Sequence, residues 1–204
     1  MDSRTQILSR LGTKQSTTIP GDTPTDLDAE AIRRHFITRA EAARCTVESV
    51  ASLESAPAAI STYLRGRNLE GPVRLAPELA GRVSVSNAQV GLPVLDQISD
   101  GLVVVATCPA AVAETGSVVV TSGEGADARL NYVAETLIML LPAAGIVSRH
   151  EEVWPLLRAR MGARLPRLVS FVTGPSRTAD IEQTIEFGAH GARHVHILIV
   201  EEGL

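Results

Sequence analysis

The 204-residue chain contains few aromatic residues and few cysteines. Phe, Trp and Tyr together make up 3 % of the residues, so a hydrophobic core has to be built mainly from Val, Leu, Ile and Ala. Cys45 and Cys108 lie far apart and belong to no CxxC pair, which excludes a self-contained zinc ribbon and an iron–sulfur site with four thiolate ligands. Cys108 follows a predicted strand, and we expect it to be buried and inert rather than a catalytic thiol.

Signals for membrane insertion, secretion and nucleic-acid binding are also missing. No apolar stretch reaches the roughly 18 residues that suggest a membrane span, and the most apolar window is broken by Pro142 and Gly145. The N-terminal sequence MDSRTQILSRLG lacks the apolar segment of a secretory signal. The formal charge of −4 argues against a broad basic surface. We therefore expect a cytoplasmic protein with no membrane span and no nucleic-acid partner.

One domain preceded by an arm is the expected organisation, because the length suits one sizeable domain. Residues 1–27 are predicted to form an N-terminal helical arm and a flexible linker, and residues 28–204 to form the domain. In the arm, Ile7, Leu8 and Leu11 lie on one side of a short helix, which would dock on a partner or on the body of the protein. The linker is rich in Thr, Gly and Pro.

Apolar strands alternate with helices beyond the linker. The patterns predict helices near residues 27–44, 54–67, 150–161 and 180–189, and strands near residues 45–50, 73–76, 102–106, 117–121, 134–142, 144–148, 167–173 and 194–200. This alternation predicts an α/β fold with an open, mostly parallel sheet flanked by helices. The strand-rich block 102–147 predicts a small β excursion. No GxGxxG or GxxxxGK[ST] nucleotide motif is present.

The loop TGPSRTADIEQ, residues 173–183, connects a predicted strand to a predicted helix. Open α/β sheets bind ligands at the carboxyl ends of their strands, where helix N-termini favour anions. Gly174 would let the backbone approach a ligand, Pro175 would fix the turn, and Ser176 or Thr178 would cap the helix. Arg177 adds a guanidinium group suited to carboxylate or phosphate. An ordinary capped turn, with acidic residues such as Asp180 in the first helical turn, remains an equal alternative.

The segment AAVAETG places Glu114 in a turn between two predicted strands, followed by Thr115 and Gly116. A carboxylate there would act as a general base, as a nucleophile or as the acceptor for a ligand hydroxyl. A turn acid that accepts hydrogen bonds from neighbouring backbone amides is the simpler interpretation.

Three of the five histidines cluster in AHGARHVH. His190 falls at the end of the predicted helix, where Gly191 resembles its left-handed cap. His194 and His196 alternate along a predicted strand and share one face. No Cys or carboxylate in the segment completes a metal site, so we favour capping and strand-surface roles, and expect no metal.

In combination, AETGSVVV and VTGPSRTADIEQTIEFGAHGARHVHILIV closely resemble the LUD domain of the lactate-utilization protein C family, over roughly residues 28–201. The family signature reads GPSxTxDIE, then a hydrophobic stretch and GxHGPR. The positions that match it are Gly174, Pro175, Ser176, Thr178, Asp180, Ile181, Glu182, Gly188, His190, Gly191 and Arg193. Ala192 replaces the usual Pro, and Ser117 stands where Thr is usual after ETG.

The resemblance implies a fold like that of the CoA-transferase, ribose-phosphate isomerase and glucosamine-phosphate deaminase group. It also implies a role in oxidising L-lactate to pyruvate, alongside partner proteins that carry iron–sulfur clusters. This chain would be a non-redox component without a cofactor of its own, and whether it is itself an enzyme stays open. The candidate site comprises Glu114 as the catalytic residue and, as ligands of a small carboxylate or phosphate, Thr115, Gly116, Gly174, Pro175, Ser176, Arg177, Thr178, Asp180, His190 and Arg193.

Two other functions are compatible with the same residues. One is a stand-alone CoA-transferase-like or ligase-like enzyme that binds a CoA ester, a sugar phosphate or a folate, but fold alone does not establish such an activity. The other is a regulatory or scaffold module that senses a carboxylate.

Overall fold

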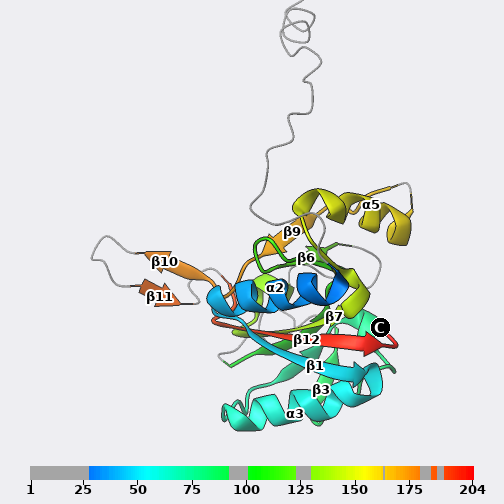
Figure 1. Cartoon of the computed structure of the whole chain (residues 1–204). Coiled ribbons are helices and arrows are strands. Elements are labelled where there is room, and N and C mark those ends of the chain that lie inside the picture. The colour runs from blue at the N-terminus through cyan, green and yellow to red at the C-terminus, as the bar shows by residue number, and fades with distance from the viewer. Residues whose placement is uncertain (1–27, 92–100, 123–129, 163, 180–184, 188–190) are drawn as a thin grey trace, which may run out of the picture.

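The computed structural model describes residues 28–91, 101–122, 130–162, 164–179, 185–187 and 191–204. They form a six-stranded sheet, a four-stranded sheet and a two-stranded hairpin, with helices packed against the two larger sheets (Figure 1). The predicted arm and linker, residues 1–27, lie outside the described residues. No helix in the described ranges is long and apolar enough to cross a membrane. The helices are α2 Ala29–Ala42, α3 Ala56–Gly66, α4 Leu130–Val133 and α5 His150–Met161, with short 3-10 turns η1 Leu53–Ser55, η2 Pro77–Leu79 and η4 Ala143–Gly145.

The larger sheet consists of six parallel strands in the order β1-β12-β7-β4-β2-β3. Their bounds are β1 Thr46–Ser52, β12 His194–Glu202, β7 Thr136–Pro142, β4 Val103–Thr107, β2 Val73–Leu75 and β3 Ala88–Val90. A parallel sheet is covered on both faces, so its central strands are nearly continuous apolar runs such as LIMLL and ILIV. The predicted open, mostly parallel α/β sheet is confirmed.

Helices α2 and α3 cover opposite faces of this sheet (Figure 1). Successive residues of β7 point to opposite sides, as a strand requires. Met139 packs in the same core cluster as Phe36 of α2, whereas Ile138 packs in the cluster that contains Ile60 of α3. All four side chains are fully buried. The two faces of the sheet therefore each have their own apolar core.

The smaller sheet confirms the predicted β excursion. Its strands, in spatial order, are β8 Ile146–Val147, β5 Ala110–Val112, β6 Ser117–Thr121 and β9 Val169–Val172. β6 runs antiparallel to both β5 and β9, and β5 runs parallel to β8. Val153 and Leu157 of α5 pack on this sheet against Val119. The sequence analysis missed β5, because AAV lies inside a segment with turn-forming residues on either side.

A helix was predicted at residues 180–189, but residues 185–187 form a strand. β10 (Arg177–Ala179) pairs antiparallel with β11 (Ile185–Phe187), and the two strands project from the body of the molecule (Figure 1). Thr184, Ile185 and Phe187 are β-branched or aromatic, which favours a strand over a helix.

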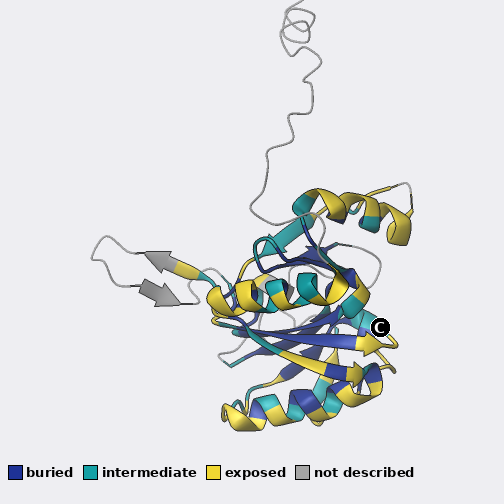
Figure 2. Cartoon of the chain, in the orientation of Figure 1, coloured by how far each residue is buried: buried dark blue, intermediate teal, exposed yellow. Residues whose placement is uncertain are grey.

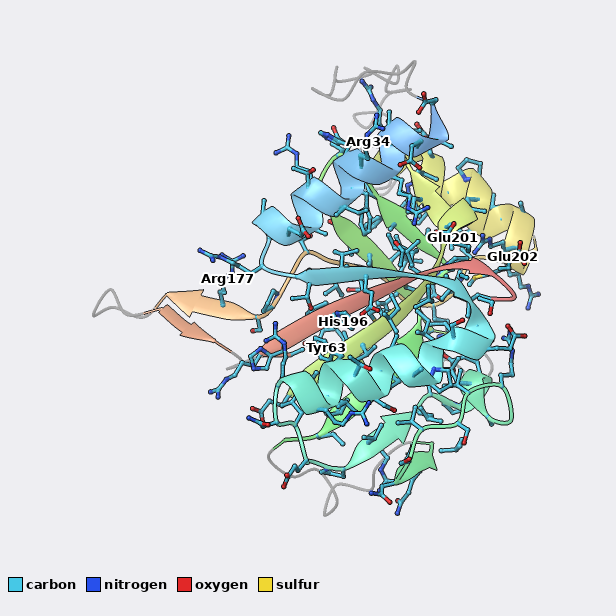
Figure 3. All side chains as sticks on the ribbon, turned by 60° about the horizontal axis from the view of Figure 1, so that its bottom comes forward. Arg34, Tyr63, Arg177, His196, Glu201 and Glu202 are labelled. Atoms are coloured by element: carbon cyan, nitrogen blue, oxygen red, sulfur yellow. The ribbon has the colours of Figure 1, made fainter. Side chains whose placement is uncertain are left out.

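His196 is buried between β12 and α3, so its predicted place on a strand surface is wrong. Its side chain is 3 % exposed, and its ring stacks on that of Tyr63 with the centroids 3.9 Å apart (Figure 3). Nδ1 lies 2.8 Å from the Thr46 hydroxyl oxygen. Burial, together with the charge of Arg67, lowers the pKa of His196 to about 4. The imidazole is therefore neutral throughout the physiological range.

This burial predicts that the protein loses stability in mild acid. Between about pH 6.5 and pH 4 the unfolded chain binds a proton at His196 that the folded chain excludes, so the free energy of unfolding falls as the pH is lowered. The loss should be about 3 kcal/mol by pH 4. Urea titrations of the wild type and of His196→Gln at several pH values measure it. A variant with the same pH dependence as the wild type would show that His196 is not responsible.

Candidate functional site

The turn that follows β9 packs against the last turn of α2. Gly174 has a φ of +79°, and a Cβ added there would lie less than 3.0 Å from the Ala43 carbonyl oxygen. Arg177 donates a hydrogen bond from Nη2 to that same oxygen at 3.0 Å, and Figure 3 shows its place near the base of β10. The Ser176 amide donates to the Ala192 carbonyl oxygen at 2.8 Å. The GPSR sequence thus joins α2 to the segment that leads into β12.

Because a β-hairpin follows this turn, Ser176 and Thr178 do not cap a helix there. The expectation that a helix N-terminus after β9 would hold the anion is therefore wrong. Thr178 belongs to β10, and its side chain is outside the described part of the structure. Asp180 and His190, two further residues of the candidate site, lie outside the described residues.

The ETG turn contacts the same helix one turn earlier. Gly116 has a φ of +71°, and a Cβ there would lie less than 3.0 Å from the Ala40 amide nitrogen. The Thr115 and Ser117 hydroxyl oxygens are 2.6 Å apart, and Ser117 is also 2.6 Å from the Thr173 hydroxyl oxygen. This row of hydroxyl groups connects the ETG turn with the residue just before the GPSR sequence. The structure therefore brings the two motifs together at the end of α2.

Glu114 lies beside His150, at the carboxyl ends of β5 and β8. Its Oε2 is 3.3 Å from His150 Nδ1, and its amide donates to the Ser148 carbonyl oxygen at 3.1 Å. The His150 ring also lies against Phe171, with the centroids 5.0 Å apart. A carboxylate paired with an imidazole can accept and pass on a proton. The sequence analysis identified Glu114 but not its partner, because 35 residues separate the two along the chain.

Arg44 ends α2 in an unusual backbone conformation. The Arg44 amide donates to the Glu41 carbonyl oxygen and the Cys45 amide to the Ala40 carbonyl oxygen, both at 2.9 Å. These two bonds form a Schellman motif, whose left-handed position normally carries glycine. Arg44 has a φ of +73°, which costs about 1 kcal/mol relative to glycine. The side chain that this strain positions lines a cavity.

The cavity has a volume of about 570 Å³, and the described residues that line it are Arg44, Pro175, Arg193 and His194. Two of these, Pro175 and Arg193, belong to the candidate site predicted from the sequence. Glu114 is not among the described lining residues. Arg44 was not predicted as a lining residue, because this helix ends without the Gly or Asn that usually marks a left-handed position.

The sequence predicted a ligand site at the carboxyl ends of the strands, but the cavity lies mainly at the opposite edge of the larger sheet. Arg44 precedes β1 and His194 begins β12, so the cavity faces the amino ends of these two strands. Among the described lining residues, Pro175 alone follows the carboxyl end of a strand, β9 of the smaller sheet. Carboxyl ends are where open α/β sheets usually bind ligands.

Among the described residues that line the cavity, Arg44 and Arg193 carry guanidinium groups and none is acidic. Arg193 lies 3.8 Å from a carboxylate oxygen of Glu135, and the Arg193 and His194 amides both donate to the Glu135 carbonyl oxygen. Burial and the positive charge of Arg67 lower the pKa of His194, with Arg193 adding to the shift and Glu135 opposing it. His194 is therefore neutral at pH 7, and the arginines supply the positive charge. Such a cavity is suited to a carboxylate or a phosphate.

Neither cysteine is poised for chemistry. Burial raises the pKa of Cys45 to about 11. Burial also raises the pKa of Cys108, whose thiol donates to the Leu140 carbonyl oxygen at 3.5 Å. The prediction that Cys108 is buried is confirmed. Within the described ranges, no three His, Cys, Asp or Glu side chains are grouped so that they could hold a metal ion.

The contact of the GPSR sequence with α2 predicts that Gly174→Ala destabilises the protein more than backbone strain alone would. Gly81 is a matched control, because its φ of +69° is close to the +79° of Gly174 but nothing lies within 4 Å of the position that a Cβ would take there. Gly81→Ala should cost about 1 kcal/mol, and Gly174→Ala should cost at least twice that, because α2 must move. Chemical denaturation measures both, and equal losses would contradict the close contact.

The chain is similar to known proteins over most of its length. The model of the LUD domain family matches residues 33–200. Lactate utilization protein C of Halalkalibacterium halodurans is 35 % identical over 92 residues, which are 44 % of this chain and 40 % of that protein. Lactate utilization protein C of Geobacillus thermodenitrificans is 28 % identical over 122 residues, which are 59 % of this chain and 51 % of that protein. The matches thus span about half or less of these relatives.

A solved structure shares the fold. The crystal structure of a DUF162 family protein from Deinococcus radiodurans superposes with a TM-score of 0.66 at 19 % identity, covering 85 % of this chain and 99 % of that one. The family match extends from α2 to β12 and includes both motifs that contact α2 as well as the cavity. The chain therefore belongs to the LUD domain family.

Proposed function

We propose that this protein is a cytoplasmic, non-redox component of a system that oxidises L-lactate to pyruvate, and that it binds a small carboxylate in the cavity. The observation that carries the proposal is the placement of Arg44 and Arg193 around one cavity at the end of α2. The role in lactate oxidation is inferred from the relatives, which are named lactate utilization protein C.

The chemistry of the cavity supports a carboxylate ligand. A guanidinium group offers paired N–H donors that match the two oxygens of a carboxylate. His194 stays neutral, so one ring nitrogen remains available to accept a hydrogen bond from a ligand hydroxyl group. L-Lactate carries both groups on adjacent carbons.

The cysteines support a division of labour in which partner proteins carry iron–sulfur clusters. Cys45 and Cys108 are both buried, and each stands alone in the sequence. An iron–sulfur cluster is normally held by four cysteine thiolates, so two isolated thiols do not provide its ligands. Electron transfer would then take place on those partners, while this chain binds the substrate or product.

A second candidate function follows from the Glu114–His150 pair. The carboxylate of Glu114, in the ETG turn, lies 3.3 Å from Nδ1 of His150. A CoA-transferase-like or ligase-like enzyme would use such a pair for nucleophilic or acid–base chemistry. Incubation with acyl-CoA followed by mass spectrometry tests this activity. A covalent adduct on Glu114 would support it, and the absence of both an adduct and CoA binding would contradict it.

The Arg44→Gly variant should be more stable than the wild type but should bind L-lactate less tightly. Glycine adopts the left-handed conformation without strain, so the free energy of unfolding should rise by about 1 kcal/mol. Loss of the guanidinium group should weaken L-lactate binding about tenfold, measured by calorimetry. In the wild type, lactate should also raise the pKa of His194 followed by NMR, because a carboxylate offsets the nearby arginine charges.

Asn68→Gly is the matched control for Arg44→Gly. Asn68 also has a positive φ, +52°, but it is not among the described residues that line the cavity. This variant should leave lactate affinity unchanged. Lactate binding that Arg44→Gly does not alter would show that the carboxylate does not bind in this cavity.

Growth on L-lactate tests the proposed pathway role. In the source organism, deletion of the gene should abolish growth on L-lactate and leave growth on pyruvate intact. Wild-type protein should restore growth, whereas the Arg44→Gly/Arg193→Ala variant should not. Normal growth of the deletion strain, in the absence of a paralogue, would refute the pathway role.

A further inference from the structure

Large apolar side chains are exposed on α5 and in the segment that follows it. Among the described residues, six such side chains are at least 36 % exposed, and four of them lie on α5 or between α5 and β9. These four are Trp154, Met161, Leu165 and Leu168. Figure 2 shows α5 on the outside of the molecule with most of its surface exposed. Apolar surface gathered in this way is typical of an interface.

Helix α5 also carries charges of opposite sign along one flank. Glu151, Trp154, Arg158 and Met161 follow one another at spacings of three, four and three, so they share one side of the helix. Glu151 lies in the first turn and Arg158 in the last, with Trp154 between them. Both charged side chains are exposed, and neither forms an ion pair within the described part of the chain.

We propose that this flank of α5 is the interface with a second copy of the same chain. Two α5 helices packed antiparallel about a two-fold axis place Glu151 of each copy opposite Arg158 of the other. Trp154 then lies near the axis, and the exposed leucines widen the apolar contact. A two-fold interface needs a surface that is complementary to itself. The flank of α5 is acidic at one end, apolar in the middle and basic at the other end. It is therefore complementary to itself when two copies pack antiparallel.

The position of α5 allows the flank to be changed without disturbing the core. Val153 and Leu157, on another side of the helix, are fully buried and hold α5 on the smaller sheet. Substitutions at Glu151 and Arg158 therefore leave these core contacts in place. The proposed interface does not depend on the proposed role in lactate oxidation.

Sedimentation equilibrium of the full-length protein tests the interface. The wild type should form dimers, and Glu151→Arg and Arg158→Glu should each raise the dimer dissociation constant at least tenfold. The double variant Glu151→Arg/Arg158→Glu exchanges the charges, so it should return the constant to within about threefold of the wild type. Arg34→Glu is the control, since it makes the same charge change at an exposed position on α2 (Figure 3) and should have no effect.

Tryptophan fluorescence gives an independent readout, because Trp154 is the only tryptophan in the chain. Dimerisation should shift its emission to shorter wavelength, because the side chain, 36 % exposed in one copy, loses contact with water. Circular dichroism of each variant verifies folding. A wild type that stays monomeric, single reversals that leave the dimer intact, or a double variant that fails to dimerise would each overturn the proposal.

Discussion

The close approach of two glycines to the last turn of α2 is the constraint on which the site depends. Gly116 meets the backbone at Ala40, and Gly174 meets it at Ala43. No side chain fits at either point, so both turns are held at van der Waals distance from the helix backbone. The two motifs are separated by more than fifty residues in sequence, and α2 is the surface that brings them together. These glycines therefore allow the two turns to pack against the helix.

The end of a helix carries partial negative charge on its free carbonyl groups, which is an unfavourable place for an anion. The structure offsets this charge with arginine. Arg177 donates to the Ala43 carbonyl oxygen, and Arg44 extends from the left-handed position just beyond it. Together with Arg193 these groups turn a helix C-terminus into a cationic surface. The proposed anion site thus relies on side-chain charge, where the loop sequence had indicated backbone amides at a helix N-terminus.

Most of the fold could be predicted from the sequence, because buried parallel strands and amphipathic helices leave strong patterns. Helix α5 begins and ends at the predicted residues, and β7 and β12 follow from their apolar runs. The hairpin of β10 and β11 could not be predicted from the same reasoning. Its TADIEQT segment combines a capping pattern with helix-forming acids, and the local pattern indicated a helix.

The site was harder to predict than the fold, since it depends on contacts between distant segments. The motif positions Pro175 and Arg193 could be identified from the sequence, and they do line the cavity. Arg44 could not, since a positively charged residue after a helix is common and its backbone conformation leaves no mark in the sequence. Burial of His196 was also missed, because strand alternation says which residues share a face but not which element covers that face.

The strand order of the larger sheet has a consequence for how the protein is made. Among the described strands, β1 lies at one edge of this sheet and pairs with β12, about 150 positions later in the chain. During synthesis β1 and α2 emerge early, yet they have no place in the sheet until β12 has left the ribosome. Contacts of such long sequence separation form slowly. The cavity, which is lined by Arg44 before β1 and by Arg193 and His194 at the start of β12, is therefore complete only after the C-terminal part of the chain has been synthesised.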